Sequence, residues 1–179
     1  MPEKNRNQLS LLPEVGSAVF SNCGTYRYIL RRIWDENRPP LVFVMLNPST
    51  ADGFDDDPTM RRCIGFAQRE NAGGMVVVNL FAFRSPYPED LKTTSDPVGP
   101  ENDQHLLDVF TQAKAQGSTV ICAWGQPGKY LKRKQEVVAL LRQANLQAYQ
   151  LGEGVQKHPL YLAAETPLLP LNVNLLTPR

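Results

Sequence analysis

Three short apolar runs constrain the fold of this 179-residue chain more than any other feature. They are LVFVML at 41–46, MVVVNL at 75–80 and TVICAW at 119–124. Their residues do not alternate between apolar and polar, which is typical of strands covered on both faces in a parallel sheet. In the segments that follow the runs, apolar residues recur at helical spacing. This spacing predicts helices over 58–71, 102–116 and 129–144.

Two further segments complete the predicted sheet. A short fourth strand is expected at 147–151. Alternating residues on both sides of Asn22-Cys23-Gly24 predict a β-hairpin over 17–34. Strands that alternate with helices indicate an α/β fold, a three-layer α/β/α domain with a four-stranded parallel central sheet. We expect the N-terminal hairpin to extend or flank that sheet.

The composition is that of an ordinary folded protein, with 42% hydrophobic and 21% charged residues. No apolar run approaches the roughly 20 residues that span a bilayer, and the first 15 residues have no signal-peptide core. We therefore expect a cytoplasmic protein without membrane contact. The predicted organisation is a flexible arm (1–15), a single domain (16–165) and a Pro- and Leu-rich tail (166–179).

Charge and cysteine content exclude several classes of site. The 19 basic and 18 acidic residues nearly balance, which predicts no strong nonspecific affinity for nucleic acid but leaves a local basic face open. Cys23, Cys63 and Cys122 lie far apart without a CxxC motif, so we interpret them as reduced thiols.

The acidic cluster Asp52–Asp57 is either a solvated loop with Asp57 as a helix cap, or a magnesium or water-positioning site. Because no second carboxylate cluster occurs, we expect neither a metal nor another cofactor.

Ligands of open α/β sheets bind beyond the carboxyl ends of the strands. Each predicted strand is followed there by polar or aromatic side chains that a core does not need. Because parallel strands bring their exits together, we expect one cleft to hold these side chains. The candidates are Asn47, Ser49, Thr50, Asn79, Arg84, Trp124, His158 and Tyr161.

Each candidate also has a structural interpretation. Asn47-Pro48 is a common turn pair, but Asn47 also offers an amide donor and an acceptor to a ligand. Asn79 is either a buried amide bonded to backbone or a reader of a ring amide. Arg84 forms either a surface ion pair or a phosphate or carboxylate contact.

His158 and the basic stretch 129–134 also leave alternatives open. A lone histidine is often structural, but Pro159 holds the chain rigidly beside His158, which suits acid–base or oxyanion chemistry. Lys129, Lys132, Arg133 and Lys134 form either a solvated helix face or the lining of a phosphate-bearing ligand.

Four segments carry a resemblance to a known family. CGTYRYILRRIWD, LNPSTADGFDDDPTMRRC, VVNLFAFRSPYPEDL and KHPLYL, in this order, resemble the bacterial and phage family called domain of unknown function 1643. The resemblance covers about residues 16–165, and the NPSTAD and NLFAFR signatures make it specific. The family name implies no activity.

The order of the strand ends also resembles the uracil-DNA glycosylase superfamily. Leu46-Asn47-Pro48-Ser49, the NLFAFR segment and His158-Pro159-Leu160-Tyr161-Leu162 are similar to its motifs. The resemblance implies that Asn47 positions the attacking water, Asn79 reads the base and His158 stabilises the departing base. The sequence departs from that pattern in Ser49 and Leu160, which stand where a glycine and a DNA-contacting serine occur, and in the missing cluster cysteines.

These observations lead to three hypotheses of function. The first is a nucleobase- or nucleotide-directed hydrolase similar to an N-glycosidase, with Asn47 and His158 as catalytic residues, assisted by Asp52. The second is a non-catalytic module that binds a nucleotide or modified base. The third is a protein whose tail, residues 166–178, docks on a partner, so that removing the tail leaves the fold intact. The expected partner is a nucleobase, a nucleotide or DNA, and the sequence predicts no oligomeric state.

Overall fold

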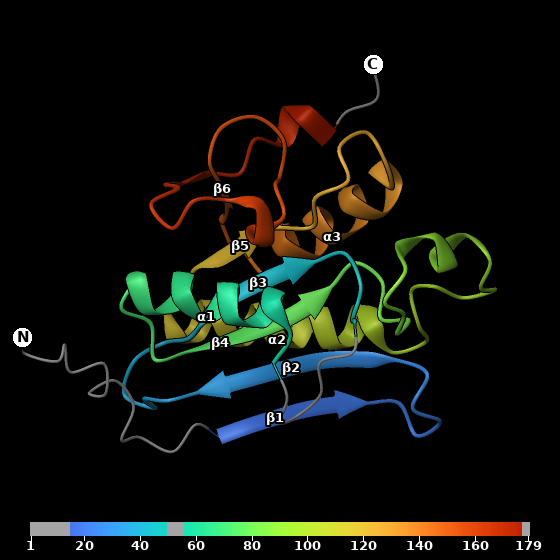
Figure 1. Cartoon of the computed structure of the whole chain (residues 1–179), viewed down its shortest axis with the longest axis horizontal. Coiled ribbons are helices and arrows are strands. Elements are labelled where there is room, and N and C mark those ends of the chain that lie inside the picture. Colours follow the sequence, from blue (N-terminus) through green and yellow to red (C-terminus); the bar gives the residue numbers. More distant parts are fainter. Residues whose placement is uncertain (1–14, 50–55, 177–179) are drawn as a thin grey trace, which may run out of the picture.

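A seven-stranded sheet is the centre of the computed structural model, which describes residues 15–49 and 56–176 (Figure 1). The strand order is β1-β2-β4-β3-β5-β6-β7. The strands are β1 (Val15–Phe20), β2 (Arg27–Ile33), β3 (Leu41–Met45), β4 (Gly74–Asn79), β5 (Val120–Cys122), β6 (Ala148–Leu151) and β7 (Leu168–Pro170). The helices are α1 (Pro58–Arg69), α2 (Asn102–Gln116) and α3 (Leu131–Gln143), with 3-10 turns η1 (Pro88–Lys92), η2 (Pro159–Tyr161) and η3 (Val173–Leu176).

The four segments predicted as parallel strands are neighbours in the middle of this sheet. β4, β3, β5 and β6 pair in parallel, with Met45 opposite Asn79 and Val44 opposite Cys122. The sheet as a whole is wider than expected and mixed, because antiparallel strands extend this parallel centre on both sides. The predicted hairpin forms β1 and β2, and β2 adds antiparallel to β4.

The other edge of the sheet comes from the segment expected to be a tail. Leu168–Pro170 pairs antiparallel with β6 as β7. A proline is tolerated at the end of an edge strand, because one side of the strand needs no ladder hydrogen bond. Three residues without alternation leave no strand signal in the sequence, which explains why this strand was not predicted.

Helices cover both faces of the sheet, so the fold has three layers (Figure 1). Met60, Cys63 and Phe66 of α1 pack with Phe43 and other residues of one face. The apolar residues of α2 and α3 pack on the opposite face, with Val42 and Val44. Alternate residues of β3 therefore enter opposite cores, and this two-sided burial accounts for the uninterrupted apolar run.

The helix boundaries follow local signals. The Asp57 side chain accepts a hydrogen bond from the backbone N–H of Met60, and Pro58 occupies the first turn of α1. α3 begins at Leu131, two residues later than predicted, because Tyr130 before it is left-handed, with φ of 56°.

In the described parts of the chain, no helix combines the length and apolar character needed to cross a membrane. The three cysteines are free thiols.

Candidate functional site

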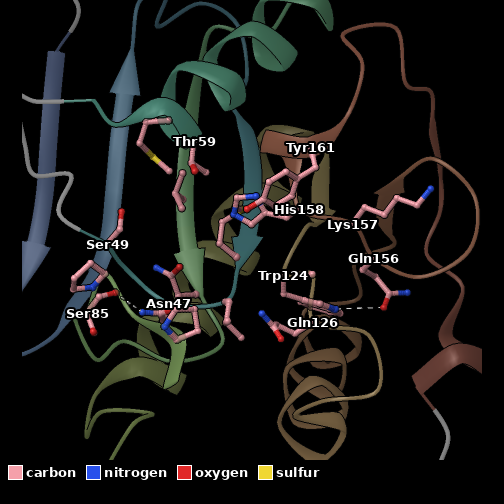
Figure 2. A pocket seen from close by; sticks show the side chains of 18 of the residues that line it. Asn47, Ser49, Thr59, Ser85, Trp124, Gln126, Gln156, Lys157, His158 and Tyr161 are labelled. Atoms are coloured by element: carbon pink, nitrogen blue, oxygen red, sulfur yellow. Dashed lines mark hydrogen bonds between the residues drawn. The ribbon is translucent and has the colours of Figure 1, made fainter. Parts of the chain in front are cut away.

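A cavity of about 600 Å³ lies at the carboxyl edge of β3, β4 and β5 (Figure 2). Its volume falls within the range of small-molecule sites. The chain exits from these strands form its walls, together with the first turn of α1 and the segment that follows β6. Its polar and aromatic lining residues are Arg27, Asn47, Ser49, Thr59, Asn79, Ser85, Trp124, Gln126, Gln156, Lys157, His158 and Tyr161.

The structure brings most of the sequence candidates together in this cavity. Six of them line it: Asn47, Ser49, Asn79, Trp124, His158 and Tyr161. Thr50 and Asp52 lie outside the described residues. The rule that parallel strands converge at their carboxyl ends accounts for this arrangement.

Arg84 does not line the cavity, which corrects the expectation that one cleft holds it with the others. The chain beyond β4 turns back toward the hairpin, where Phe83 forms an antiparallel bridge with Tyr26. The Arg84 backbone N–H then donates to the Thr25 carbonyl at 3.1 Å. Pairing with the hairpin therefore carries Arg84 out of the cavity.

Asn47 presents an acceptor to the cavity. Its amide nitrogen donates to the carbonyls of Pro48 at 3.1 Å and Ser85 at 2.9 Å. Both donors are thus engaged by backbone, and Oδ1 receives no hydrogen bond from the described residues. This narrows the expectation that Asn47 offers both a donor and an acceptor, because only the acceptor remains for a ligand or water.

Asn79 has an unsatisfied amide. The residue ends β4 and is only 1% exposed. Neither Nδ2 nor Oδ1 has a hydrogen-bond partner in the described part of the chain. An unpaired buried polar group costs about 1–3 kcal/mol, so native proteins rarely keep one without a reason. Within the described residues, this amide is therefore free to bond a ligand or water in the cavity.

His158 presents a hydrogen-bond donor. Its Nδ1 accepts from the Leu160 backbone N–H at 3.3 Å. In a neutral ring this bond leaves the proton on Nε2. Burial lowers the pKa of His158, although the carboxylate of Asp57 opposes the shift. The neutral form with Nε2–H is therefore favoured at neutral pH.

Tyr161 and Trp124 supply aromatic surface at different depths. The Tyr161 ring lies 5.6 Å from the His158 ring, centroid to centroid, and is 83% exposed at the rim. Trp124 is buried, and its indole N–H donates to Gln156 Oε1 at 3.3 Å (Figure 2). Gln156 in turn donates to Gln150 Oε1 at 3.3 Å. This relay fixes the indole as an apolar wall of the cavity.

Ser49 links the first loop to helix α1. Its hydroxyl donates to the carboxylate of Asp57, which also caps the helix through Met60. Asp56 pairs with the buried Arg32 at 2.8 Å. The two described members of the acidic cluster are therefore engaged structurally. No group of three or more possible metal ligands occurs among the described residues.

The basic stretch at the start of α3 is not a solvated face throughout, and its residues do not line the cavity. Arg133 and Lys134 are buried. Arg133 donates to the Leu80 carbonyl at 2.8 Å and pairs with Asp103 at 2.5 Å. Arg133 and Lys134 thus hold the chain segments that follow β4 and β5 from the side of α3.

Lys134 supports the cavity wall in a way that the sequence did not reveal. Its Nζ donates to the carbonyls of Gly125 at 3.0 Å and Gln126 at 2.7 Å. Both residues are left-handed, with φ of 63° and 50°. Lys134 is 2% exposed, and burial lowers its pKa to about 8. A lysine that holds two carbonyls of one loop fixes the cavity-lining turn after β5.

The cavity also contains residues that were not among the candidates. Arg27, Thr59, Gln126, Gln156 and Lys157 line it. Arg27 begins β2 beside the β4 exit, where its backbone N–H donates to the Ala82 carbonyl at 3.0 Å. The strand-end rule could not find Arg27, because β2 runs antiparallel to β4, so that the start of β2 lies at this edge. The described lining contains no carboxylate.

Comparison with known proteins gives a family. A family model described as “Protein of unknown function (DUF1643)” matches residues 27–160, well over half of the chain. No curated protein and no solved structure matches the chain.

Proposed function

The chain belongs to the family described as “Protein of unknown function (DUF1643)”, and we propose that it is a nucleobase- or nucleotide-directed hydrolase similar to an N-glycosidase. The base enters the cavity at the carboxyl edge of the sheet, and the protein hydrolyses the bond between base and sugar. The residues that carry this proposal are Asn79 for recognition, and Asn47 and His158 for chemistry.

The unsatisfied amide of Asn79 is the main observation in support. It lines the cavity and has neither a donor nor an acceptor partner among the described residues. A side-chain amide offers an acceptor beside two donors. A nucleobase presents complementary donors and acceptors on its Watson–Crick edge, and pockets for extruded bases read that edge. A bound base would therefore satisfy the amide.

His158 and Asn47 supply the groups that glycosidic cleavage requires. The bond between the base nitrogen and C1′ breaks with its electron pair on the base, and water adds to C1′. His158 donates its Nε2–H to the developing negative charge, a role worth a few kcal/mol for a preorganised donor. Asn47 Oδ1 accepts from the attacking water and orients it. The proton of that water ends on the released base.

The resemblance of LNPS, NLFAFR and HPLYL to motifs of the uracil-DNA glycosylase superfamily assigns the same roles to Asn47, Asn79 and His158. Leu160 stands where that superfamily has a DNA-contacting serine. The resemblance thus supports the pocket and its chemistry more than a particular substrate.

A non-catalytic binding module is the second candidate. The described cavity lining contains no carboxylate, whereas glycosidases commonly use one as a base or nucleophile. Asn47 has no ionisable proton and is no strong base. A protein that keeps the recognition amide without a base would bind the ligand and release it unchanged.

Base release is the test. The purified protein is incubated with nucleosides, nucleotides, and single- and double-stranded DNA containing uracil or hypoxanthine, and free base is measured by chromatography. We expect release from at least one substrate. The single-turnover rate should fall about 100-fold or more in His158→Ala, with substrate affinity within several-fold.

His105→Ala is the matched control, because His105 is the only other histidine and stacks on Tyr28 away from the cavity. Its rate should equal that of the wild type. Binding without release would establish the binding module instead. Absence of both binding and release would refute the proposal.

A further inference from the structure

A second hollow, of about 390 Å³, opens beside the cavity at the hairpin turn. We name it the Arg84 groove. Ser49, Ser85 and Pro86 line both hollows, so the two lie side by side. The groove is completed by Gly24, Thr25, Phe83 and Arg84. A ligand that fills the cavity would reach the groove across these three residues.

Arg84 is fixed in the groove by two contacts on different parts of its guanidinium. Nη1 donates to the Gly24 carbonyl at 2.9 Å. The guanidinium carbon lies 4.7 Å from the centroid of the Phe20 ring, a cation–π distance. One contact fixes an edge of the planar group and the other fixes its face, so the group is held in one orientation before any ligand arrives.

One nitrogen on the opposite edge of this guanidinium, Nε, is unsatisfied. Nε is buried and has no hydrogen-bond partner in the described structure. Nε and Nη2 form one of the two forks of an arginine, and such a fork matches two oxygens of a phosphate or carboxylate. If Arg84 only supported the hairpin turn, burying Nε without an acceptor would remain a net cost. An acceptor beside this edge would satisfy Nε, and a phosphate or carboxylate fits the fork best.

The charge of the groove also favours an anion. Arg84 is the only charged residue among its described lining, which contains no carboxylate. Asp90, whose carboxylate accepts from the Ser85 hydroxyl, is not part of the described lining of the groove. Lys157, the exposed cation of the main cavity, points away from the other labelled side chains (Figure 2). Arg84 is therefore the cation that the groove itself offers to an anionic extension of the ligand.

We propose that the Arg84 groove binds a phosphate group of the same ligand whose base occupies the cavity. The inference rests on the base-binding half of the proposed function and is independent of hydrolysis. It narrows the ligand to a phosphorylated nucleotide unit, either a mononucleotide or one unit of a single strand, and disfavours a free base or nucleoside.

Equilibrium binding of matched ligands tests the inference. The probes are four nucleosides, their 5′-monophosphates and five-residue single-stranded oligonucleotides, measured by calorimetry at fixed salt. We expect a phosphorylated probe to bind about 10- to 100-fold more tightly than its nucleoside, the range for hydrogen bonds to a charged group. Tighter binding of the mononucleotide or of the oligonucleotide identifies the source of the phosphate.

Substitution of Arg84 tests whether this residue causes the tighter binding of the phosphorylated probes. Arg84→Met should abolish it while leaving nucleoside affinity unchanged. Arg84→Lys keeps the charge but loses the fork, and should retain only part of the affinity advantage of the phosphorylated probes. This variant takes the place of Arg84→Met if Arg84→Met does not fold. Arg69→Met is the matched control, because Arg69 lies over Phe66 at 5.0 Å and donates to two backbone carbonyls away from both hollows.

The outcomes separate the two proposals. Equal binding of nucleoside and phosphorylated probe, or an advantage that survives in Arg84→Met, overturns the inference and leaves base binding intact. Absence of binding by every probe overturns base binding, and the inference with it. Loss of the advantage in Arg69→Met as well would assign the effect to general charge and overturn the role of Arg84.

Discussion

Two buried amides, those of Asn102 and Asn79, differ in the hydrogen bonds that their nitrogens donate. Asn102 is fully buried at the start of α2, and its nitrogen donates to the carbonyls of Asn79 at 3.1 Å and Leu80 at 3.2 Å. It holds the end of β4 against α2. The side chain of Asn79, one of the residues that Asn102 anchors, has no partner in the described structure. The first amide serves stability, and the second is available for recognition.

This difference predicts opposite effects of the same substitution. Asn79→Leu replaces an unpaired polar group by an apolar one of similar size, so the free energy of unfolding should stay level or rise by about 1 kcal/mol. Asn102→Leu removes the donor of the Asn79 carbonyl and one of the two donors of the Leu80 carbonyl, which keeps its bond from Arg133, and should lower the free energy of unfolding by about 1–3 kcal/mol. Urea denaturation of both variants measures the effects. A large loss in Asn79→Leu would mean that Asn79 serves stability and would weaken its role in recognition.

At the scale of elements, the sequence predicted what local patterns encode. Apolar runs located β3, β4 and β5, and Asp57-Pro58 located the start of α1. β7 could not be predicted, because three residues are too few to show an alternation of apolar and polar side chains. Arg84 was misplaced because its position depends on the bridge between Tyr26 and Phe83, two segments far apart in the chain. The sequence therefore predicts those site residues whose positions depend only on where a strand ends, such as Asn47, Asn79 and Trp124.

The role of Lys134 could not be predicted from local patterns either. Lysine is usually solvated on a helix, and only the packed structure places this one beneath the loop after β5. No carboxylate pairs with its ammonium in the described chain. Its charge is stabilised by two carbonyls and penalised by burial, which lowers its pKa from the usual 10.5 to about 8.

Lys134 therefore predicts a pH dependence of stability. Between about pH 8 and 10.5 the unfolded chain keeps the lysine proton that the folded protein has lost, so this group makes the free energy of unfolding rise with pH. Lys134→Met removes that contribution, and the difference between wild type and variant should grow in favour of the wild type across this window. Denaturation at several pH values measures it. Lys132→Met, at an exposed position of the same helix, is the control and should show a constant difference. A constant difference for Lys134→Met as well would refute a lowered pKa.

At the scale of the whole molecule, the C-terminal segment is connected to the cavity. β7 pairs with β6, and the Asn172 backbone N–H donates to Gln150 Oε1 at 3.0 Å. Gln150 is bonded to Gln156, which holds the indole of Trp124 in the cavity wall. The segment that the sequence suggested as a docking tail thus supports the site from the far edge of the sheet.

Removal of residues 166–179 should consequently destabilise the fold. Leu176 is 3% exposed, and burying a leucine contributes about 1.5–3 kcal/mol. The truncation also deletes the ladder between β6 and β7 and the bond to Gln150, each hydrogen bond adding about 1 kcal/mol. Thermal and urea denaturation should show a loss of about 3 kcal/mol or more, together with weaker ligand binding, because the Trp124 relay loses its outer support.

Point variants separate packing from partner docking in the same segment. Leu176→Ala should lower stability by about 2–4 kcal/mol, as expected for a buried leucine. Val173→Ala lies in the same 3-10 turn but is 38% exposed, and its stability should stay within about 1 kcal/mol of the wild type. A truncated protein as stable as the wild type would show that β7 adds nothing to the sheet, and would return these residues to the role of a free docking tail. A destabilised truncation with a matching loss in Leu176→Ala assigns them to the fold, since docking on a partner cannot change the stability of the isolated chain.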